Sequence, residues 1–154
     1  MEVFYTSDVS LQPTREKDGV GWDIRSARSM NMFPNQTSLL PTSIRLLMPN
    51  GVFATVLSRS GLAAKQNIFV LNSPGLIDTN YTGEIKVILS RLPDVDRGNE
   101  PFKINIGDRI AQLVFQPDHE IDLCRVPEEE FCRMVEETTE TNLRGSDGFG
   151  STGV

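Results

Sequence analysis

The segment Arg109-Ile-Ala-Gln-Leu-Val-Phe115 decides the fold class, because its residues follow the period of a β-strand. A period of two places Gln112 on the same face as Ile110 and Val114. If that face is the core, the buried amide of Gln112 needs hydrogen-bond partners. A ligand, another loop or a purely structural contact would satisfy the amide, and Gln112 is therefore a candidate site residue.

Similar short apolar segments precede this strand and are separated by turn residues: Ile44–Met48, Val52–Leu57, Ile68–Leu71 and Ile85–Leu89. They are rich in Val, Ile and Phe, and most are too short to be helices. Nine prolines punctuate the chain, in a rhythm typical of an all-β sandwich or barrel. The sequence thus predicts a single all-β domain of roughly ten short strands.

Two segments are predicted to be helical. Gly61–Gln66 contains Ala, Leu, Lys and Gln, and Ser60 precedes it as a candidate N-cap. Pro127–Glu137 opens with a proline and three acids, and continues with an apolar stripe at helical spacing: Phe131, Met134 and Val135. Packing in the core explains that stripe better than a cofactor site does.

Length and charge limit the classes of protein to consider. A chain of 154 residues fits one domain, and a net charge of −6 argues against binding to nucleic acid, which needs a broad basic surface. A small anion would need only a few placed cations or a divalent metal ion. No apolar run is long enough to span a membrane, so we expect no membrane partner.

Two cysteines, Cys124 and Cys132, are too few for a disulfide framework, and neither they nor His119 have metal-like spacing. We expect the cysteines to be buried and His119 to be solvated. No signal or transit peptide is recognisable, so the protein is expected to be intracellular, in the cytoplasm or the nucleus.

The glycine-rich tail Arg144–Val154 is predicted to grip a phosphorylated ligand. Its glycines can turn backbone N–H groups toward oxyanions, and Arg144 adds a forked cation. Phe149 offers a flat face for a nucleobase, and three residues offer hydroxyl groups: Ser146, Ser151 and Thr152. The alternative is a frayed terminus, which segments of this composition also form.

Two segments nearer the N-terminus contain polar residues that are candidates for a binding site. Asp23 lies between apolar neighbours and suits a magnesium ion held through ordered waters, although a lone Asp is more often a turn former. Ser58–Ala64 joins a strand to a helix, where Arg59 and Ser60 would favour an anion. A surface turn with a helix cap accounts for the same residues equally well.

The segment Leu71–Ile85 has turn residues on both sides of Asp78 and Tyr81 and is predicted to be a hairpin. A carboxylate and a phenol at one bend can face the same pocket, where Asp78 would act as a general base on water. The amide of Asn72 has the donor and the acceptor needed to recognise a pyrimidine edge. A hairpin with ordinary Asp and Tyr residues is the alternative.

Five motifs follow one another along the chain: Gly21-Trp-Asp, Ser58-Arg-Ser-Gly-Leu-Ala, Gly75-Leu-Ile-Asp-Thr-Asn-Tyr-Thr-Gly, Gly107-Asp-Arg-Ile-Ala-Gln-Leu and Arg144-Gly-Ser-Asp-Gly-Phe-Gly-Ser-Thr-Gly. In this order they resemble the motifs of the trimeric deoxyuridine triphosphatase (dUTPase) family. The resemblance implies a distorted jelly-roll β barrel with a β-clip over residues 1–138. It also implies a mobile arm over residues 139–154 that closes on the site of a neighbouring subunit.

The activity implied by this resemblance is Mg²⁺-dependent hydrolysis of dUTP to dUMP and pyrophosphate by a homotrimer with shared active sites. Asp78 resembles the base that deprotonates the attacking water. Asp23 resembles the carboxylate that holds Mg²⁺ through water, and Tyr81 resembles the ring that packs under the deoxyribose.

The same resemblance implies the substrate contacts. The residues that resemble the uracil-binding ones are Asn72, Gly75, Leu76, Ile77 and Lys86. Those that match phosphate-contacting positions are Arg59, Ser60, Gly61 and Gln112. The arm of a neighbouring chain would contribute Arg144, Phe149, Gly150, Ser151 and Thr152.

Two other functions compete with this one. A dCTP deaminase shares the fold, but it would need a catalytic glutamate and usually a second serine after the motif arginine, where this chain has Ser60 followed by Gly61. A regulatory protein with a dUTPase-like fold would use the acidic segment Pro127–Glu137 to bind a protein partner. Partner capture that depends on this segment, with unchanged dUTP hydrolysis, would distinguish it.

Overall fold

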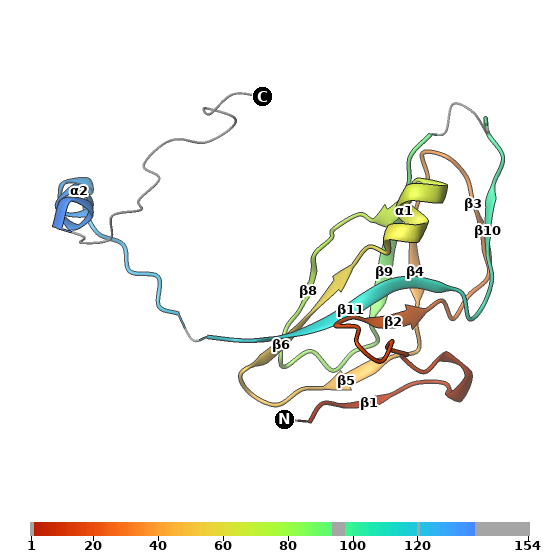
Figure 1. The fold of residues 1–154 in the computed structure, drawn as a ribbon, viewed down its shortest axis with the longest axis horizontal. Helices are drawn as coiled ribbons and strands as arrows, with labels where there is room; N and C mark the ends of the chain where they lie inside the picture. The colour runs from red at the N-terminus through yellow and green to blue at the C-terminus, as the bar shows by residue number, and fades with distance from the viewer. Residues whose placement is uncertain (1, 94–97, 120, 138–154) are drawn as a thin grey trace. The chain divides into compact units, whose positions relative to one another are not determined.

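The computed structural model describes residues 2–93, 98–119 and 121–137 (Figure 1). Contacts divide the chain into two compact units, unit 1 at Met1–Glu120 and unit 2 at Ile121–Val154. Each unit is described by itself. The predicted boundary between residues 138 and 139, and the predicted arm, lie outside the described residues.

Unit 1 consists mainly of short strands, as the sequence predicts. Its strands are β1 (Phe4–Thr6), β2 (Trp22–Arg25), β3 (Met30–Met32), β4 (Thr37–Pro41), β5 (Arg45–Leu47), β6 (Val52–Leu57), β7 (Ile68–Val70), β8 (Gly75–Ile77), β9 (Lys86–Arg91), β10 (Phe102–Ile104) and β11 (Arg109–Pro117). A 3-10 turn, η1 (Val9–Leu11), follows β1, and a helix, α1 (Ser60–Gln66), follows β6.

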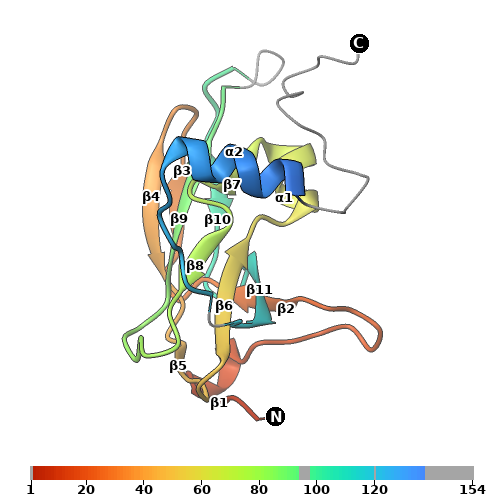
Figure 2. The same ribbon diagram turned by 90° about the vertical axis from the view of Figure 1, so that its left-hand side faces the viewer.

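The strands pair antiparallel in four small sheets, in the orders β1-β5, β10-β3, β2-β11-β6-β8 and β4-β9-β7. The sheets do not join into one closed barrel within the described residues, and the arrangement is that of a distorted jelly roll (Figure 2). Side chains from different sheets meet in one core, and those at most 1% exposed include Ile24, Leu40, Ile68, Leu89 and Leu113.

Strand β11 is central because it pairs with β2 on one side and with β6 on the other. Its register against β2 shifts between Arg109 and Ala111, which marks a β-bulge. As a result Ile110 and Ala111 are both buried, whereas Gln112 is half-buried. The prediction that Gln112 shares a face with Ile110 is therefore wrong, because the extra residue interrupts the period of two.

The segment around Asp78 and Tyr81 is not a β-hairpin. Strand β8, before the bend, pairs with β6, whereas β9, after the bend, pairs with β4 and β7. The loop between them therefore crosses from one sheet to another. Turn-forming residues predict that the chain bends, but they do not determine which strand pairs with which.

Both predicted helices are present. Helix α1 has Arg59 rather than Ser60 at its N-cap, without a side-chain cap hydrogen bond, and it ends at Asn67 in the left-handed region with a φ of 56°. In unit 2, helix α2 spans Glu128–Glu137. Among the described residues, no helix is both long enough and apolar enough to cross a membrane.

Several expectations about burial in unit 2 are wrong. The α2 stripe is exposed rather than packed in a core, with 56% of Phe131, 51% of Met134 and 42% of Val135 accessible. Cys124 and Cys132 are free and exposed as well, since the described part of unit 2 is too short to bury them. The exposure of His119, at the end of unit 1, confirms the expectation for that residue.

One buried cation joins three strands of unit 1. Arg91, at the end of β9, is only 2% exposed. Its Nη1 donates to the carbonyl of Met32 on β3 at 2.8 Å and to that of Glu100, just before β10, at 2.7 Å. Through these two bonds Arg91 ties the end of β9 to the β3–β10 ribbon.

Replacing Arg91 with leucine is expected to lower the free energy of unfolding by about 2–4 kcal/mol, because each buried carbonyl that loses its donor costs about 1–3 kcal/mol. Urea unfolding at a fixed protein concentration measures the change. Lys103→Leu, at an exposed position on β10, is the control and should stay within about 0.5 kcal/mol of the parent. Equal stability of the two variants would contradict this role.

Candidate active site

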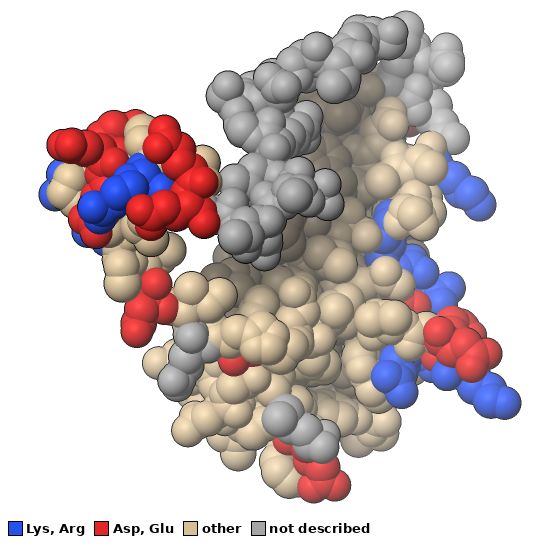
Figure 3. All heavy atoms as spheres, turned by 60° about the vertical axis from the view of Figure 1, so that its left-hand side comes forward, with Lys and Arg blue, Asp and Glu red and all other residues tan. Residues whose placement is uncertain are grey.

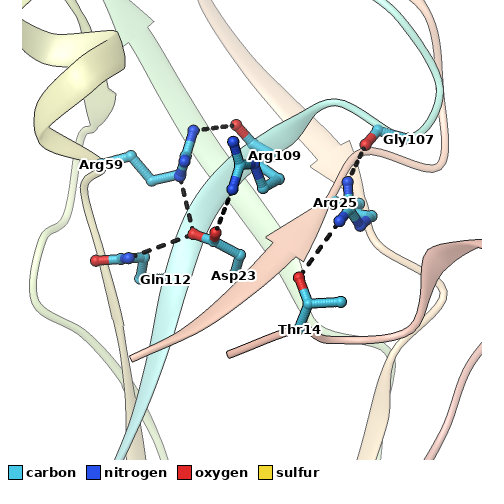
Figure 4. A network of polar contacts seen from close by, with 7 residues as sticks. All are labelled: Thr14, Asp23, Arg25, Arg59, Gly107, Arg109 and Gln112. Carbon is cyan, nitrogen blue, oxygen red and sulfur yellow. Dashed lines mark hydrogen bonds and ion pairs between the residues drawn. The ribbon is translucent and has the colours of Figure 1, made fainter. Parts of the chain in front are cut away.

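A buried carboxylate surrounded by donors forms the first part of the site. Asp23 on β2 is 7% exposed. Its Oδ1 accepts from Nε of Arg59 at 2.9 Å and from Nε2 of Gln112 at 3.3 Å, and its Oδ2 accepts from Nη1 of Arg109 at 3.1 Å (Figure 4). We call Asp23, Arg59, Arg109 and Gln112 the Asp23 network.

Backbone pairing positions the members of this network. Asp23 lies opposite Gln112 in the β2–β11 ladder, and Gln112 lies opposite Leu57 at the end of β6. Arg59 follows two residues after Leu57, and its Nη1 donates to the carbonyl of Arg109 at 3.2 Å. Asp23 also pairs with Thr14 through two backbone hydrogen bonds of 2.7 and 3.1 Å. The carboxylate is thus fixed before any ligand arrives.

The charges of the Asp23 network favour an anion. Two guanidinium groups face one carboxylate, so the network carries an excess of positive charge. The side chain of Arg59 is 22% exposed and that of Arg109 is 45% exposed. Guanidinium groups with free donors at the surface bind phosphate oxygens well. The next residues of α1, Ser60 and Gly61, are exposed beside them.

Sequence reasoning missed Arg109, although it belongs to the same motif as Gln112. In a regular strand, residues 109 and 112 point to opposite faces, because their separation is odd. The bulge after Arg109 changes this parity, so both side chains reach Asp23. The sequence signal that could have identified Arg109 is its place in the motif, three residues before Gln112.

A cavity of about 310 Å³ forms the second part of the site. Its lining includes five of the predicted residues: Leu76, Ile77, Asp78, Tyr81 and Lys86. Glu84 and Ile85 complete it. Asn72 and Gly75 precede the lining residues in the chain. They lie close to each other, since a Cβ on Gly75 would be 3.0 Å from Nδ2 of Asn72. We call this second part the Asp78 cavity.

The structure does not bring the Asp78 cavity and the Asp23 network together within one chain. Ile77 pairs with Ala54, and Thr79 donates its hydroxyl to the carbonyl of Val52 at 2.7 Å, so Asp78 lies near the start of β6. Arg59 follows the end of the same strand. At about 3.3 Å per residue, the two parts are separated by roughly 20 Å along β6. The other predicted residues, Arg144, Phe149, Gly150, Ser151 and Thr152, lie outside the described residues.

Among the described residues, the possible metal ligands of the site suit an ion that keeps most of its own water ligands. Within the parts of the chain that the structure describes, no group of three or more His, Cys, Asp or Glu side chains could hold an ion. Asp23 offers a carboxylate beside the cationic residues, and each of its oxygens keeps lone pairs beyond the bonds it already accepts. This fits Mg²⁺ that keeps its waters and takes further ligands from substrate phosphates.

Comparison with known proteins agrees with this geometry. The dUTPase family model matches residues 8–153. A deoxyuridine 5'-triphosphate nucleotidohydrolase of Helicobacter pylori is 40% identical over 146 residues, which are 94% of this chain and 90% of that protein.

Two solved structures share the fold. A mutant dUTPase of Staphylococcus bacteriophage 80alpha with dUpNHpp, described among phage dUTPases that control transfer of virulence genes, has a TM-score of 0.78 and 25% identity over 99% of each chain. A mutant dUTPase from phage phi11 of S. aureus, described for its coordination of a structural Mg(II) ion, has a TM-score of 0.72 and 24% identity, over 85% of this chain and 100% of that one.

The matched region contains both the Asp23 network and the Asp78 cavity, and it extends through the glycine-rich tail. The order of the motifs, the jelly-roll strands and the match over nearly the full length agree with one another. The chain belongs to the dUTPase family.

Proposed function

We propose that this protein is a dUTP diphosphatase, which hydrolyses dUTP to dUMP and pyrophosphate by attack of water on the α-phosphorus. This reaction keeps uracil out of DNA and supplies dUMP for thymidylate synthesis. The observation that carries the proposal is the cavity in which Asp78 and Tyr81 lie together, in a chain that also presents an anion-binding Asp23 network.

Asp78 is the proposed general base. Its carboxylate is exposed and lines the cavity, so a water molecule can reach it. Asp78 accepts a proton from that water as the oxygen attacks the α-phosphorus. Such a base contributes about 10²–10⁴-fold in rate. Positioning and charge neutralisation account for most of the remaining acceleration in phosphoryl transfer.

The rest of the Asp78 cavity recognises the nucleoside. The ring of Tyr81 packs under the deoxyribose and leaves no space for a 2′-hydroxyl group. Asn72, with the backbone of Gly75–Ile77 and of Lys86, pairs with the uracil edge. Cytosine would present the opposite donor and acceptor pattern, and mispaired buried polar groups are costly.

The Asp23 network binds the phosphates. Arg59, Ser60, Gly61 and Gln112 are the proposed contacts, and the structure adds Arg109 as a second cation beside them. When bound, Mg²⁺ would neutralise charge on the phosphate oxygens, and Asp23 would hold it through water. The tail residues Arg144, Phe149, Gly150, Ser151 and Thr152 are proposed to close over the bound nucleotide.

We also propose a homotrimer in which neighbouring chains share each site. One small nucleotide cannot reach both the Asp78 cavity and the Asp23 network of a single chain, because roughly 20 Å of β6 separates them. Part of the surface of unit 1 shows few charged side chains, as expected of a surface that other chains cover (Figure 3). On β8, Leu76 is 62% exposed in the single chain.

A regulatory protein partner for α2 stays a prediction. It is supported by the exposed α2 stripe of Phe131, Met134 and Val135. The description of phage dUTPases that control transfer of virulence genes belongs to a relative whose identity is 25%. A regulatory role is compatible with the catalytic proposal, since α2 contributes none of the proposed catalytic residues.

Replacing Asp78 with asparagine is expected to reduce kcat for dUTP about 10²–10⁴-fold, because the amide cannot accept the proton of the attacking water. Pyrophosphate release in the presence of Mg²⁺ measures the rate. The variant should still bind dUpNHpp, which shows that the site is folded. Asp118→Asn, an exposed carboxylate after β11, is the control and should keep the parental rate. Equal rates for Asp78→Asn and the parent would refute the assignment of the base.

Mixed oligomers test whether the site is shared. Chains carrying Asp78→Asn and chains carrying Arg59→Ala are each expected to be inactive. Equal mixtures that reassemble at random should recover about a quarter of the parental activity, because in one site in four Asp78 comes from an Arg59→Ala chain and Arg59 from an Asp78→Asn chain. Size-exclusion chromatography confirms assembly.

The matched control for this experiment mixes Asp78→Asn with Asp78→Ala, two inactivating changes of the same residue in the Asp78 cavity. No site of that mixture is intact, so it should recover nothing. If the first mixture recovers no more activity than the control mixture, the two parts of the site do not come from different chains.

Replacing Asp23 with asparagine is expected to raise the Mg²⁺ concentration that gives half-maximal activity by about 10–100-fold, which is the usual effect of losing a residue that orients a metal's ligands. Titration of Mg²⁺ into metal-free enzyme with dUTP measures it, with Asp118→Asn as the control. An unchanged Mg²⁺ requirement would remove Asp23 from the proposed metal site.

A further inference from the structure

We propose that Gly83 is a specificity-determining residue, because it provides the surface on which the Tyr81 ring lies. The inference rests on the proposed function, in which this ring separates deoxyribose from ribose. Gly83 would act through Tyr81 without touching the substrate, and it is therefore a positioning residue.

The contact between the ring and Gly83 is very close. A Cβ atom built on Gly83 would lie 2.6 Å from Oη of Tyr81, 2.7 Å from its Cζ and 3.1 Å from its Cε2. Real Cβ atoms do not approach other atoms to less than about 3.0 Å, and close-packed atoms do not overlap. Any side chain at this position would therefore displace the ring.

Backbone conformation does not explain this glycine. The described glycines with a positive φ are Gly51, Gly98 and Gly107, and Gly83 is not among them. An alanine at residue 83 would thus meet no backbone strain of the kind that favours glycine. The three atoms nearest to such a Cβ all belong to the Tyr81 side chain.

The loop around Gly83 is held in place on both sides. The carbonyl of Thr82 accepts from Nε of Arg45 at 2.8 Å. The Glu84 carboxylate accepts from the backbone N–H of Ser43 at 2.9 Å. Because β5 and the turn before it hold the neighbours of Gly83, an added methyl group moves the ring more easily than the backbone.

The ring has a second contact that depends on the same arrangement. Oη of Tyr81 donates to the carbonyl of Glu84 at 3.0 Å, across the face of Gly83. A ring displaced by a Cβ would lose this bond and turn away from its position in the Asp78 cavity. The wall against the ribose 2′-hydroxyl would then be lost, and discrimination between dUTP and UTP would fall.

The experiment compares kcat/KM for dUTP and UTP in the parent, Gly83→Ala, Tyr81→Ala and the double variant. Gly19→Ala is the matched control, since its Cβ would make ordinary contacts of 3.4 Å and its φ is not positive. The dUTP/UTP preference should fall at least tenfold in Gly83→Ala and stay unchanged in Gly19→Ala. In the Tyr81→Ala background, Gly83→Ala should change the preference no further, because coupled residues are not additive.

Urea midpoints of the same four proteins provide a readout that does not depend on turnover. Gly83→Ala should lower the midpoint in the parent but leave it unchanged when Tyr81 is alanine, since the clash is then absent. An equal loss in both backgrounds would overturn the proposal, and so would an unchanged dUTP/UTP preference in Gly83→Ala while Tyr81→Ala loses it. If Tyr81→Ala itself keeps the preference, the sugar-selecting role in the proposed function fails, and the midpoints still test the ring contact.

Discussion

The double ion pair of Asp23 with Arg59 and Arg109 is the interaction on which the part of the site proposed to bind phosphate depends. It joins side chains from β2, from β11 and from the end of β6, three neighbouring strands of one sheet. A carboxylate that is 7% exposed would be costly to bury without such partners. The same pairing holds both guanidinium groups at the start of α1, so the arrangement that compensates Asp23 also prepares a site for an anion.

Strand β6 gives the site its second constraint. The sheet places the Asp23 network at one end of this strand and the Asp78 cavity at the other. A strand is stiff and its length is fixed by its residues, so the two parts cannot approach each other by a local movement. Catalysis by the proposed mechanism therefore requires association of chains, and each chain would supply halves of two different sites.

Much of the fold follows from local patterns in the sequence. Strands are predicted by the alternation in Arg109–Phe115 and by the apolar runs that prolines separate. Helices are predicted by the composition of Gly61–Gln66 and Pro127–Glu137. The structure contains these strands and helices. The failures concern information that is not local. Three features depend on residues that are distant in the chain: which strands pair on either side of Asp78, the bulge that turns Arg109 toward Asp23, and the exposure of Cys132. The order of the motifs predicted a set of site residues, but their spacing could not show which of them meet within one subunit.

The charge of the Asp23 network contrasts with that of the whole chain, which is −6. At physiological ionic strength, exposed charges are screened beyond about 8 Å. A free nucleotide that reaches the network interacts mainly with Arg59 and Arg109 and is attracted. Unit 1 contains 13 acidic and 12 basic residues, so most of the negative charge of the chain belongs to unit 2. The proposed substrate therefore needs only these two placed cations, rather than a broad basic surface, to be held at the network.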